Sequence, residues 1–461
     1  MSTASQFPQI SDADPILSAP DLAFETRQLH AGAAFPDIAG ARRTPIYLTA
    51  GFEFNDFEDA HDRFTGTNSG PVYTRIGNPT TAAVESRLAA LEGGIDALVV
   101  ASGQAAVSVA LFGLLRAGDH VVAAANIYEG SRNLLSENLA NLGITTSFVA
   151  QSNDLNAWRE AVRPNTRAFF AESIANPRNE VLDIAAVAAI AHDAGAPLLI
   201  DNTLATPYLL RPIEHGADIV IHSASKFLAG HGSALAGVIV DSGRFAWAGS
   251  PHTFTHLHQA KDGKSGTSFV DRFGPHAYLQ YARDVIAARL GPVVSPFHAF
   301  LLEQGLETLS IRVERQTENA LALASWLAQQ PEVESVEYAG LPDEESHVRV
   351  THYLPQGGGS VFSFTLRGGR ETARAVFDAL QVFTRMTHLG DTRSLVIHPA
   401  TTTHALRSAD ERAVAGITDG LLRVSIGLES VADLQNDLQR AFTLARQDTH
   451  PRAAHSESVA A

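Results

Sequence analysis

Cysteine is absent from this chain of 461 residues, and methionine occurs only twice. Without cysteine, the chain cannot form disulfides, thiolate metal sites or a cysteine nucleophile. Basic residues are also scarce, because 34 Lys and Arg stand against 50 Asp and Glu and give a formal net charge of −16 at pH 7. Nucleic acids and anionic membranes would repel such a surface, so neither is expected as a partner.

Long hydrophobic runs are missing as well. The one long uncharged stretch, residues 98–115, is interrupted by Ser102, Gly103 and Gln104. This fits a buried strand followed by a buried helix better than a membrane span. The first 14 residues have neither the basic nor the apolar region of a secretion signal, which predicts a cytoplasmic protein. The spacing of His252, His256 and His258 is ligand-like, but nothing nearby completes a site, so no metal is expected.

What is present is the pattern of a globular α/β protein, with 45% hydrophobic and 18% charged residues. Short apolar runs alternate with helical patterns, which predicts a mostly parallel central sheet with helices on both faces and a smaller C-terminal α+β domain. The strands of the central sheet are expected at residues 97–101, 120–125, 144–150, 167–171, 197–200, 219–221 and 236–240. The expected divisions are an N-terminal arm (1–65), an α/β domain (66–295), the smaller domain (296–447) and a disordered tail (448–461).

Two further segments carry structural expectations. Residues 242–282 have a less regular pattern and are rich in Gly, His and aromatic residues, and we interpret them as a long functional loop or excursion. Residues 296–329 have the pattern of a long amphipathic helix that can break near Gly305.

The most informative stretch is residues 219–232, Ile-Val-Ile-His-Ser-Ala-Ser-Lys-Phe-Leu-Ala-Gly-His-Gly. Its β-branched start is typical of a buried strand, and Lys226 follows where a parallel strand opens into a cleft. A partly desolvated lysine can lose its proton and attack an aldehyde, while Ser223 and Ser225 could place hydroxyls on a phosphate. These groups suit pyridoxal phosphate held as a Schiff base. A solvated surface lysine is the commoner alternative.

Asp201 and Tyr128 also follow predicted strands. Asp201 comes directly after the apolar residues 197–200. A carboxylate there is poorly solvated and needs a cationic partner, which a protonated pyridine nitrogen would supply; a turn-capping Asp is the alternative. The Tyr128 ring could stack on a flat cofactor and its hydroxyl could move a proton, although a core or interface tyrosine has the same spacing.

Two anion sites are predicted from other strand ends. Ser102, Gly103 and Gln104 lie between a strand and a helix, where backbone N–H groups bind phosphate; an ordinary Ser N-cap is the alternative. By strand alternation Arg423 shares a face with small residues, while Leu422, Val424 and Ile426 face the core. This arrangement favours bidentate capture of a substrate carboxylate, with a salt bridge to Glu429 or another acid as the alternative.

Motifs along about nine-tenths of the chain closely resemble the Cys/Met-metabolism family of pyridoxal-phosphate enzymes, which have the fold-type-I transferase architecture. Within that family the O-acetylhomoserine sulfhydrylase branch is the most similar. The matching motifs are Phe-Glu-Thr-Arg-Gln-Leu-His-Ala-Gly (24–32), Tyr-Thr-Arg-Ile-Gly-Asn-Pro-Thr (73–80), Leu-Glu-Gly-Gly (91–94), Ala-Ser-Gly-Gln-Ala-Ala (101–106), Asp-Asn-Thr-Leu-Ala-Thr-Pro-Tyr (201–208), Gly-Leu-Glu-Thr-Leu (305–309) and Ser-Leu-Val-Ile-His-Pro-Ala (394–400).

The resemblance implies a role for each matching residue. Lys226 would bind the cofactor covalently and shuttle protons, Asp201 would pair with the pyridine nitrogen, and Tyr128 would stack on the ring. The remaining cofactor contacts would come from Ser102, Gly103, Gln104, Asn176, Ser223 and Ser225, and the substrate contacts from Arg423, Ser394 and His388. Tyr73 and Arg75 would reach the phosphate of a neighbouring subunit. The arm 1–65 would then be an inter-subunit segment, with a dimer as the minimal unit and usually a tetramer.

The reaction implied by the resemblance is γ-replacement by a transferase: acetate leaves O-acetylhomoserine, and sulfide or methanethiol adds to give homocysteine or methionine. Some positions depart from the family pattern. The family usually has Tyr-Gly-Gly-Thr where this chain has Tyr128-Glu-Gly-Ser131, and His388 stands where the sulfhydrylase branch tends to carry Asn. Gly130 falls where methionine γ-lyases have a Cys. Cystathionine γ-synthase, cystathionine γ-lyase and methionine γ-lyase activities stay as alternatives, with a non-catalytic α/β binding protein as the remote one.

Overall fold

The computed structural model describes residues 22–32, 40–68, 70–259, 266–343 and 346–449. The first 21 residues of the expected arm and residues 450–461 of the expected tail lie outside this range. The chain divides into two compact units. The first is formed by the described parts of Met1–Asn176, Val181–Val313 and Thr351–Pro355, and the second by those of Pro177–Glu180, Glu314–Val350 and Gln356–Ala461.

The first unit contains a seven-stranded sheet with the order β1-β7-β6-β5-β4-β2-β3. Its strands are β1 (Asp96–Val100), β2 (His120–Ala124), β3 (Thr145–Val149), β4 (Thr166–Glu172), β5 (Leu198–Asp201), β6 (Ile219–His222) and β7 (Gly237–Asp241). All neighbours are parallel except β7, which is antiparallel to both β1 and β6. Each expected strand is present, and its ends differ from the prediction by at most one residue.

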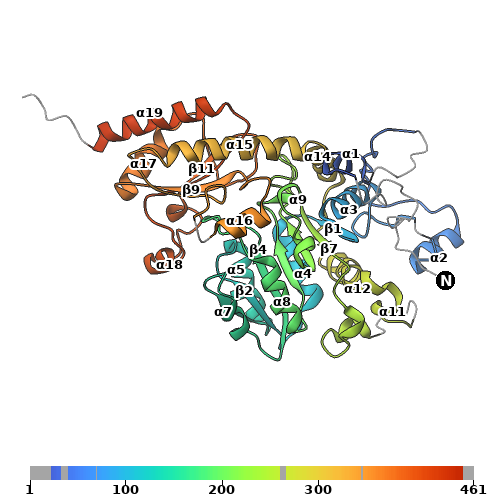
Figure 1. Ribbon diagram of the computed structural model, residues 1–461. Coiled ribbons are helices and arrows are strands. Elements are labelled where there is room, and N and C mark those ends of the chain that lie inside the picture. The colour runs from blue at the N-terminus through green and yellow to red at the C-terminus, as the bar shows by residue number, and fades with distance from the viewer. Residues whose placement is uncertain (1–21, 33–39, 69, 260–265, 344–345, 450–461) are drawn as a thin grey trace, which may run out of the picture. The chain divides into compact units, whose positions relative to one another are not determined.

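Helices flank this sheet, as Figure 1 shows for α4 and α8 beside the green strands. The helices of the first unit include α1 (Phe24–His30), α2 (Phe57–Thr65), α3 (Pro79–Glu92), α4 (Gly103–Leu114), α5 (Glu129–Asn133), α7 (Leu155–Glu160), α8 (Ile184–Asp193), α9 (Thr206–Leu209) and α14 (Pro296–Leu306). Local chemistry sets their starts: Asn78 caps α3 ahead of Pro79, and the Ser102 side chain caps α4 by accepting from Ala105 N at 3.1 Å.

The predicted irregular excursion 242–282 is confirmed only in part, because its described residues also form short helices. This segment contains α10 (Thr255–His258), α11 (Phe269–Phe273) and α12 (Ala277–Tyr281). Aromatic packing fixes it, because the buried Trp247 ring stacks on the Tyr278 ring with centroids 5.1 Å apart. The hydrogen bonds of two of its histidines also contribute, since ring nitrogens of His256 and His258 each lie 2.9 Å from a backbone carbonyl oxygen. The aromatic content that suggested a functional loop is core.

The expected helix 296–329 is divided into α14 and α15 (Leu309–Leu327), which confirms a break just after Gly305. Close packing gives the reason. A Cβ on Gly305 would lie 2.4 Å from the carbonyl oxygen of Leu228, so the helix can approach the segment after Lys226 only with glycine at this position.

The second unit contains a five-stranded sheet with the order β10-β11-β12-β9-β8. Its elements include β8 (Val333–Glu337), α16 (His347–Tyr353), β9 (Val361–Leu366), α17 (Gly369–Ala379), β10 (Thr384–Arg385), β11 (Leu395–Ile397), α18 (Ala409–Val414), β12 (Leu421–Ser425) and α19 (Val431–Thr449). Figure 1 shows α15, α17 and α19 along the orange strands. Leu422, Val424 and Ile426 lie in the core cluster formed with these helices, as strand alternation predicts.

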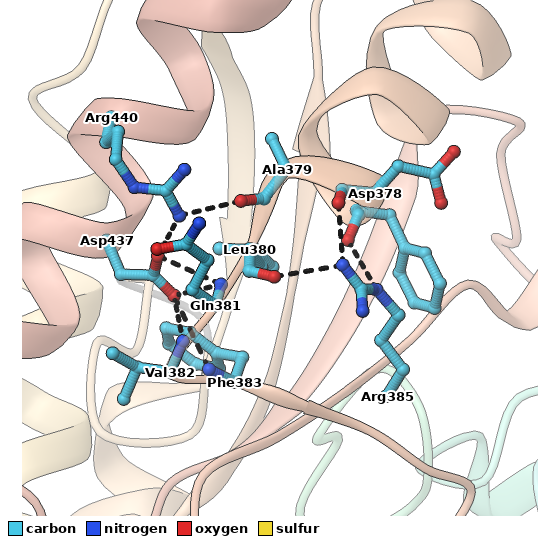
Figure 2. Close-up of polar contacts among 10 residues, drawn as sticks. Asp378, Ala379, Leu380, Gln381, Val382, Phe383, Arg385, Asp437 and Arg440 are labelled. Carbon is cyan, nitrogen blue, oxygen red and sulfur yellow. Dashed lines mark hydrogen bonds and ion pairs between the residues drawn. The ribbon is translucent and has the colours of Figure 1, made fainter.

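A carboxylate on α19 holds the chain that leads into β10 (Figure 2). Asp437 accepts hydrogen bonds from the N–H groups of Gln381, Val382 and Phe383 and pairs with Arg440 at 2.5 Å. Burial alone would raise the pKa of Asp437, but these donors lower it below its ordinary value. These charge-assisted hydrogen bonds therefore attach α19 to the segment that leads into the sheet of the second unit.

No helix in the described ranges is long and apolar enough to cross a membrane. Within the same part of the chain, no group of three or more His, Asp or Glu side chains is placed to hold a metal ion.

Candidate active site

The carboxyl ends of five strands lie at one edge of the seven-stranded sheet. Because β1 and β6 are both antiparallel to β7, they run in the same direction as each other and as β5, β4 and β2. At these ends the sequence places Ser102 after β1, Tyr128 after β2, Glu172 on β4, Asp201 on β5 and the turn with Lys226 after β6. Ligands of parallel α/β sheets bind at this edge.

Lys226 lies half-buried in the turn that follows β6. Its backbone N–H donates to Ser223 O at 3.1 Å, and its carbonyl accepts from Gly230 N at 2.8 Å, so the turn is closed on both sides of the lysine. The Ser223 and Ser225 hydroxyl oxygens lie 3.2 Å apart. The turn therefore presents one amine and two hydroxyls at the strand end.

The first turn of α4 lies directly against this lysine turn. A Cβ on Gly103 would lie 2.6 Å from Ser223 Cβ and 2.8 Å from Ser223 Oγ, so only glycine allows the approach. Gln104 Nε2 donates to Gly130 O at 3.0 Å. The N-terminus of a twelve-residue helix beside two hydroxyls forms an anion cradle.

Asp201 ends β5 in register with Glu172 of β4. Thr203 donates to Asp201 Oδ1 from its backbone N–H at 3.0 Å and from its hydroxyl at 2.5 Å. The Thr203 hydroxyl also accepts from Ser223 N at 2.8 Å, which links Asp201 to the lysine turn. Burial raises the pKa of Asp201 above its ordinary value, while the Thr203 bonds and His222 act against this shift.

Glu172 is a buried acid of the site that the sequence analysis missed. Its Oε1 accepts from the backbone N–H of Tyr128 at 2.6 Å, and its carboxyl group also accepts from the backbone of Asn176. Burial and the neighbouring charge of Asp201 raise the pKa of Glu172 well above its ordinary value. Glu172 therefore favours its protonated form more than an ordinary glutamate does, and it fixes the backbone on which Tyr128 and Asn176 stand.

We expect Glu172→Gln to retain the structure at pH 7, because the amide keeps an acceptor and mimics the protonated acid. The wild-type protein binds a proton that its unfolded chain releases above the ordinary pKa of 4.5, so its stability falls as the pH rises toward the raised value. The thermal midpoint of Glu172→Gln should therefore gain on that of the wild-type holoenzyme between pH 5 and pH 8.

The control for this prediction is Glu172→Ala, which leaves two buried backbone donors without their acceptor. That loss should cost about 2–4 kcal/mol at both pH values. A thermal midpoint of Glu172→Gln that runs parallel to the wild type between pH 5 and pH 8 would show that Glu172 is ionised.

Tyr73 and Arg75 lie before α3, in a segment tied by a bridge between Gly51 and Tyr73. The Arg75 guanidinium lies over the Tyr73 ring, 5.5 Å from its centroid, and donates to Ala288 O. Both side chains are exposed, Tyr73 by 43%. The Tyr128 side chain is likewise 54% exposed.

The predicted carboxylate-binding residues lie in the second unit. Arg423 is buried on β12, and its Nη2 lies 3.5 Å from His388 O. Burial lowers the pKa of Arg423 to about 10, so it stays charged at neutral pH. Both oxygens of Glu429 accept from Ser394, at 2.7 Å from its N–H and 2.8 Å from its hydroxyl. Ser394 therefore serves to position Glu429, whose carboxylate faces this serine.

The chain matches the family described as Cys/Met metabolism PLP-dependent enzyme over residues 25–443. The chain belongs to this family. It is thus an enzyme that uses pyridoxal phosphate and has the fold-type-I architecture, which confirms the family, fold and cofactor expected from the motifs.

Members of the Cys/Met-metabolism family resemble this chain along nearly its whole length. An O-acetyl-L-homoserine sulfhydrylase of Corynebacterium glutamicum is 42% identical over 91% of this chain and 96% of its own. A homocysteine synthase of Schizosaccharomyces pombe is 42% identical over 92% of this chain and 98% of its own. The solved structure of a Campylobacter jejuni protein described as O-acetylhomoserine (thiol)-lyase, which contains N'-pyridoxyl-lysine-5'-monophosphate, is 34% identical, with a TM-score of 0.87 over 92% of this chain and 100% of its own.

The residues at the strand ends fit the cofactor of this Cys/Met-metabolism enzyme. Gly103, Ser223 and Ser225 form a cradle whose hydroxyls and helix N-terminus suit a phosphate, and Lys226 follows in the same turn. Asp201 is a desolvated carboxylate that a pyridine N–H would stabilise. Gly103 is the position that tests the fit of the phosphate, because any side chain there would fill the cradle.

The structure thus brings most of the predicted cofactor residues to one edge of a sheet. Besides Glu172, the sequence analysis missed Thr203, His222 and Glu92, which contact these residues or lie behind them. A signal existed for two of them. Glu172 ends a strand as Asp201 does, and His222 directly precedes Ser223 in the stretch that carries Lys226.

Proposed function

We propose that this chain catalyses γ-replacement on O-acetylhomoserine, in which sulfide or methanethiol displaces acetate to give homocysteine or methionine. The observation that carries the proposal is the set of relatives about 40% identical over nine-tenths of the chain that are named O-acetyl-L-homoserine sulfhydrylase or homocysteine synthase. The strand-end residues support it, since they supply an amine, an anion cradle and a buried acid.

The proposed roles come from the resemblance to the Cys/Met-metabolism family, and the strand-end positions of several of these residues support them. Gly103, Ser223 and Ser225, with Ser102 and Gln104, would hold the phosphate of the cofactor. Asp201 would bind its ring nitrogen, Asn176 its ring hydroxyl and Tyr128 one ring face. Bound pyridoxal phosphate supplies an electron sink that stabilises negative charge at the substrate Cα.

The proton transfers are then assigned to this chain's own residues. The Lys226 amine would accept the proton from the substrate Cα and move it among the reacting carbons. The hydroxyl of the exposed Tyr128 would also take part in these proton transfers. In the second unit Arg423 would bind the substrate carboxylate, with Ser394 and His388 shaping that site; the pKa of Arg423 of about 10 keeps it cationic at neutral pH.

We further propose a cytoplasmic homo-oligomer, with a dimer as the minimal unit and a tetramer as the working form. The exposed Tyr73 and Arg75 support the dimer, because they would be available to the phosphate site of a second copy. Small-angle scattering of the purified protein tests the oligomer, and a monomer with full activity would contradict it.

The function is tested by supplying the holoenzyme with O-acetylhomoserine, O-acetylserine, O-succinylhomoserine or methionine, each with and without sulfide. We expect homocysteine from O-acetylhomoserine only when sulfide is present. Homocysteine from O-succinylhomoserine and cysteine from O-acetylserine should form at a much lower rate. Release of methanethiol from methionine without sulfide would assign the chain to the lyases instead. Cystathionine formed from O-succinylhomoserine when cysteine is supplied in place of sulfide would assign it to cystathionine γ-synthase.

A further inference from the structure

A buried arginine beside the lysine turn, residues 223–230, binds uncharged oxygens only. Arg312 lies in the first turn of α15 and is 5% exposed. Within the described part of the chain, its four hydrogen bonds go to three carbonyls and one hydroxyl. Burying a guanidinium without a carboxylate partner is costly, so the contacts that hold it require an explanation.

Two of the three carbonyls belong to the lysine turn. Nη1 of the guanidinium donates to Phe227 O at 2.9 Å, and Nη2 lies 3.5 Å from Leu228 O. Nη2 also donates to Gly305 O in the last turn of α14 at 2.7 Å, while Nε donates to the Thr308 hydroxyl at 3.2 Å. The planar fork of the guanidinium thus joins the lysine turn to the end of α14.

The lysine turn needs donors from outside its own backbone. Lys226 O accepts from Gly230 N at 2.8 Å, which is the last backbone hydrogen bond of the turn. The chain then leaves the turn, and no backbone N–H of the described residues donates to the carbonyls of Phe227 and Leu228. Both residues are buried, so water does not replace the missing donor. Arg312 supplies it.

The fit between the guanidinium and the turn is close. A Cβ on Gly230, where φ is +74°, would lie 2.1 Å from Arg312 Nη1. On the other side, a Cβ on Gly305 would lie 2.5 Å from Ala229 O. Glycine is therefore required on both sides of the contact, and the turn has little room to shift relative to α14.

We propose that Arg312 is a positioning residue for Lys226. By binding the carbonyl of the residue that follows Lys226, its guanidinium fixes the backbone from which the lysine side chain extends, and with it the place of the amine. The inference rests on the proposed role of Lys226. Because Arg312 binds the backbone of the turn, it acts through Lys226 and is not assigned a chemical step of its own.

The test compares Arg312→Gln and Arg312→Lys with the wild-type holoenzyme. Glutamine has two N–H donors on one nitrogen and does not span the turn and α14, whereas lysine keeps the charge and loses the fork. A misplacement of about 1 Å can lower a rate by about 10²-fold. We therefore expect kcat to fall by about 10²-fold in Arg312→Gln and by about tenfold in Arg312→Lys, with KM nearly unchanged.

A second measurement needs no turnover. The circular dichroism of the visible cofactor band reports the asymmetry that the site imposes on the bound cofactor. Its strength relative to the absorbance should fall from the wild type to Arg312→Lys and further to Arg312→Gln. Thr308→Val removes only the hydroxyl that accepts from Nε at an exposed position. It should cause a smaller change in the same direction, and it tests the proposal even where Arg312→Gln does not fold.

The matched control is Arg116→Gln. The Arg116 guanidinium also donates to carbonyls at the end of an element, to Phe112 O at 3.0 Å and to Leu115 O at 2.5 Å. These carbonyls lie at the end of α4 that is remote from the lysine turn. This variant should lower the thermal midpoint and leave kcat and the dichroism of the band unchanged. The same pattern in Arg312→Lys and Thr308→Val would overturn the proposal and make Arg312 a structural cap.

The outcome is separable from that of the proposed function. The dichroism is read without substrate, and kcat is measured with whichever substrate the wild-type holoenzyme converts. Failure to convert O-acetylhomoserine would therefore overturn the proposed function and leave this result standing. A cofactor bound covalently to a lysine other than Lys226 would remove the role of Lys226 and the positioning role of Arg312 with it.

Discussion

Replacing Lys226 by alanine is expected to abolish the visible absorbance band of the bound cofactor and to lower the γ-replacement rate by about 10³-fold or more. The variant loses both the covalent attachment and the amine that moves protons. The surrounding turn should persist, because its hydrogen bonds use the Lys226 backbone. Absorbance spectra of wild type and variant loaded with pyridoxal phosphate provide the measurement.

The small number of lysines in the chain provides a control for the attachment site of the cofactor. Lysine occurs three times in the chain, at positions 226, 261 and 264. Borohydride reduction of the holoenzyme followed by peptide mass spectrometry should place the pyridoxyl group on Lys226. The double variant Lys261→Ala and Lys264→Ala should keep band and activity. A label on Lys261 or Lys264 would contradict the assignment.

The sequence predicted the seven-stranded sheet well because its strands are short, apolar and separated by helical patterns. The strand ends that carry Ser102, Asp201 and Lys226 were found by the same rule, since parallel strands deliver their carboxyl ends to one edge. Glu172 was missed because the predicted strand stopped at residue 171, one residue too early. A single residue of boundary error thus concealed a buried acid.

The residues behind the strand ends could not be predicted in this way. Glu92 and His222 are 130 positions apart, and only the packing of α3 beneath the sheet joins them. The prediction for residues 242–282 is confirmed only in part for a related reason, because aromatic rings that pack on one another have the same composition as rings that line a site. The local sequence pattern predicts whether a segment is a helix or a strand. It does not predict which distant helix or strand packs against that segment.

In the second unit, the predicted alternation of β12 is confirmed. The alternative role of Arg423, a salt bridge with Glu429, competes with the hydrogen bonds that Glu429 accepts from Ser394. Ser394 donates to both Glu429 oxygens, and its hydroxyl accepts from Gly427 N at 3.0 Å. The substrate carboxylate stays the proposed ligand of Arg423.

The second large effect is expected from Arg423→Lys, which should raise the KM for O-acetylhomoserine by about 10²-fold at pH 7. Lysine keeps the charge but loses the two parallel N–H groups that match a carboxylate. The effect should grow as the pH rises. Burial lowers the pKa of Arg423 only to about 10, so the wild-type KM stays nearly constant to pH 9, whereas a buried lysine starts from an ordinary pKa of about 10.4 and loses its proton earlier.

Two controls separate carboxylate binding from damage to the fold. Arg393→Lys changes an exposed arginine of the same unit and should leave KM unchanged at every pH. The carboxamide of O-acetylhomoserine lacks the negative charge, so wild type and Arg423→Lys should bind it nearly equally. Since Lys226 lies in the other unit, the cofactor band should be intact in both variants. If Arg423→Lys weakened binding of the ester and its carboxamide to the same extent, Arg423 would support the structure of β12 and would not recognise the substrate.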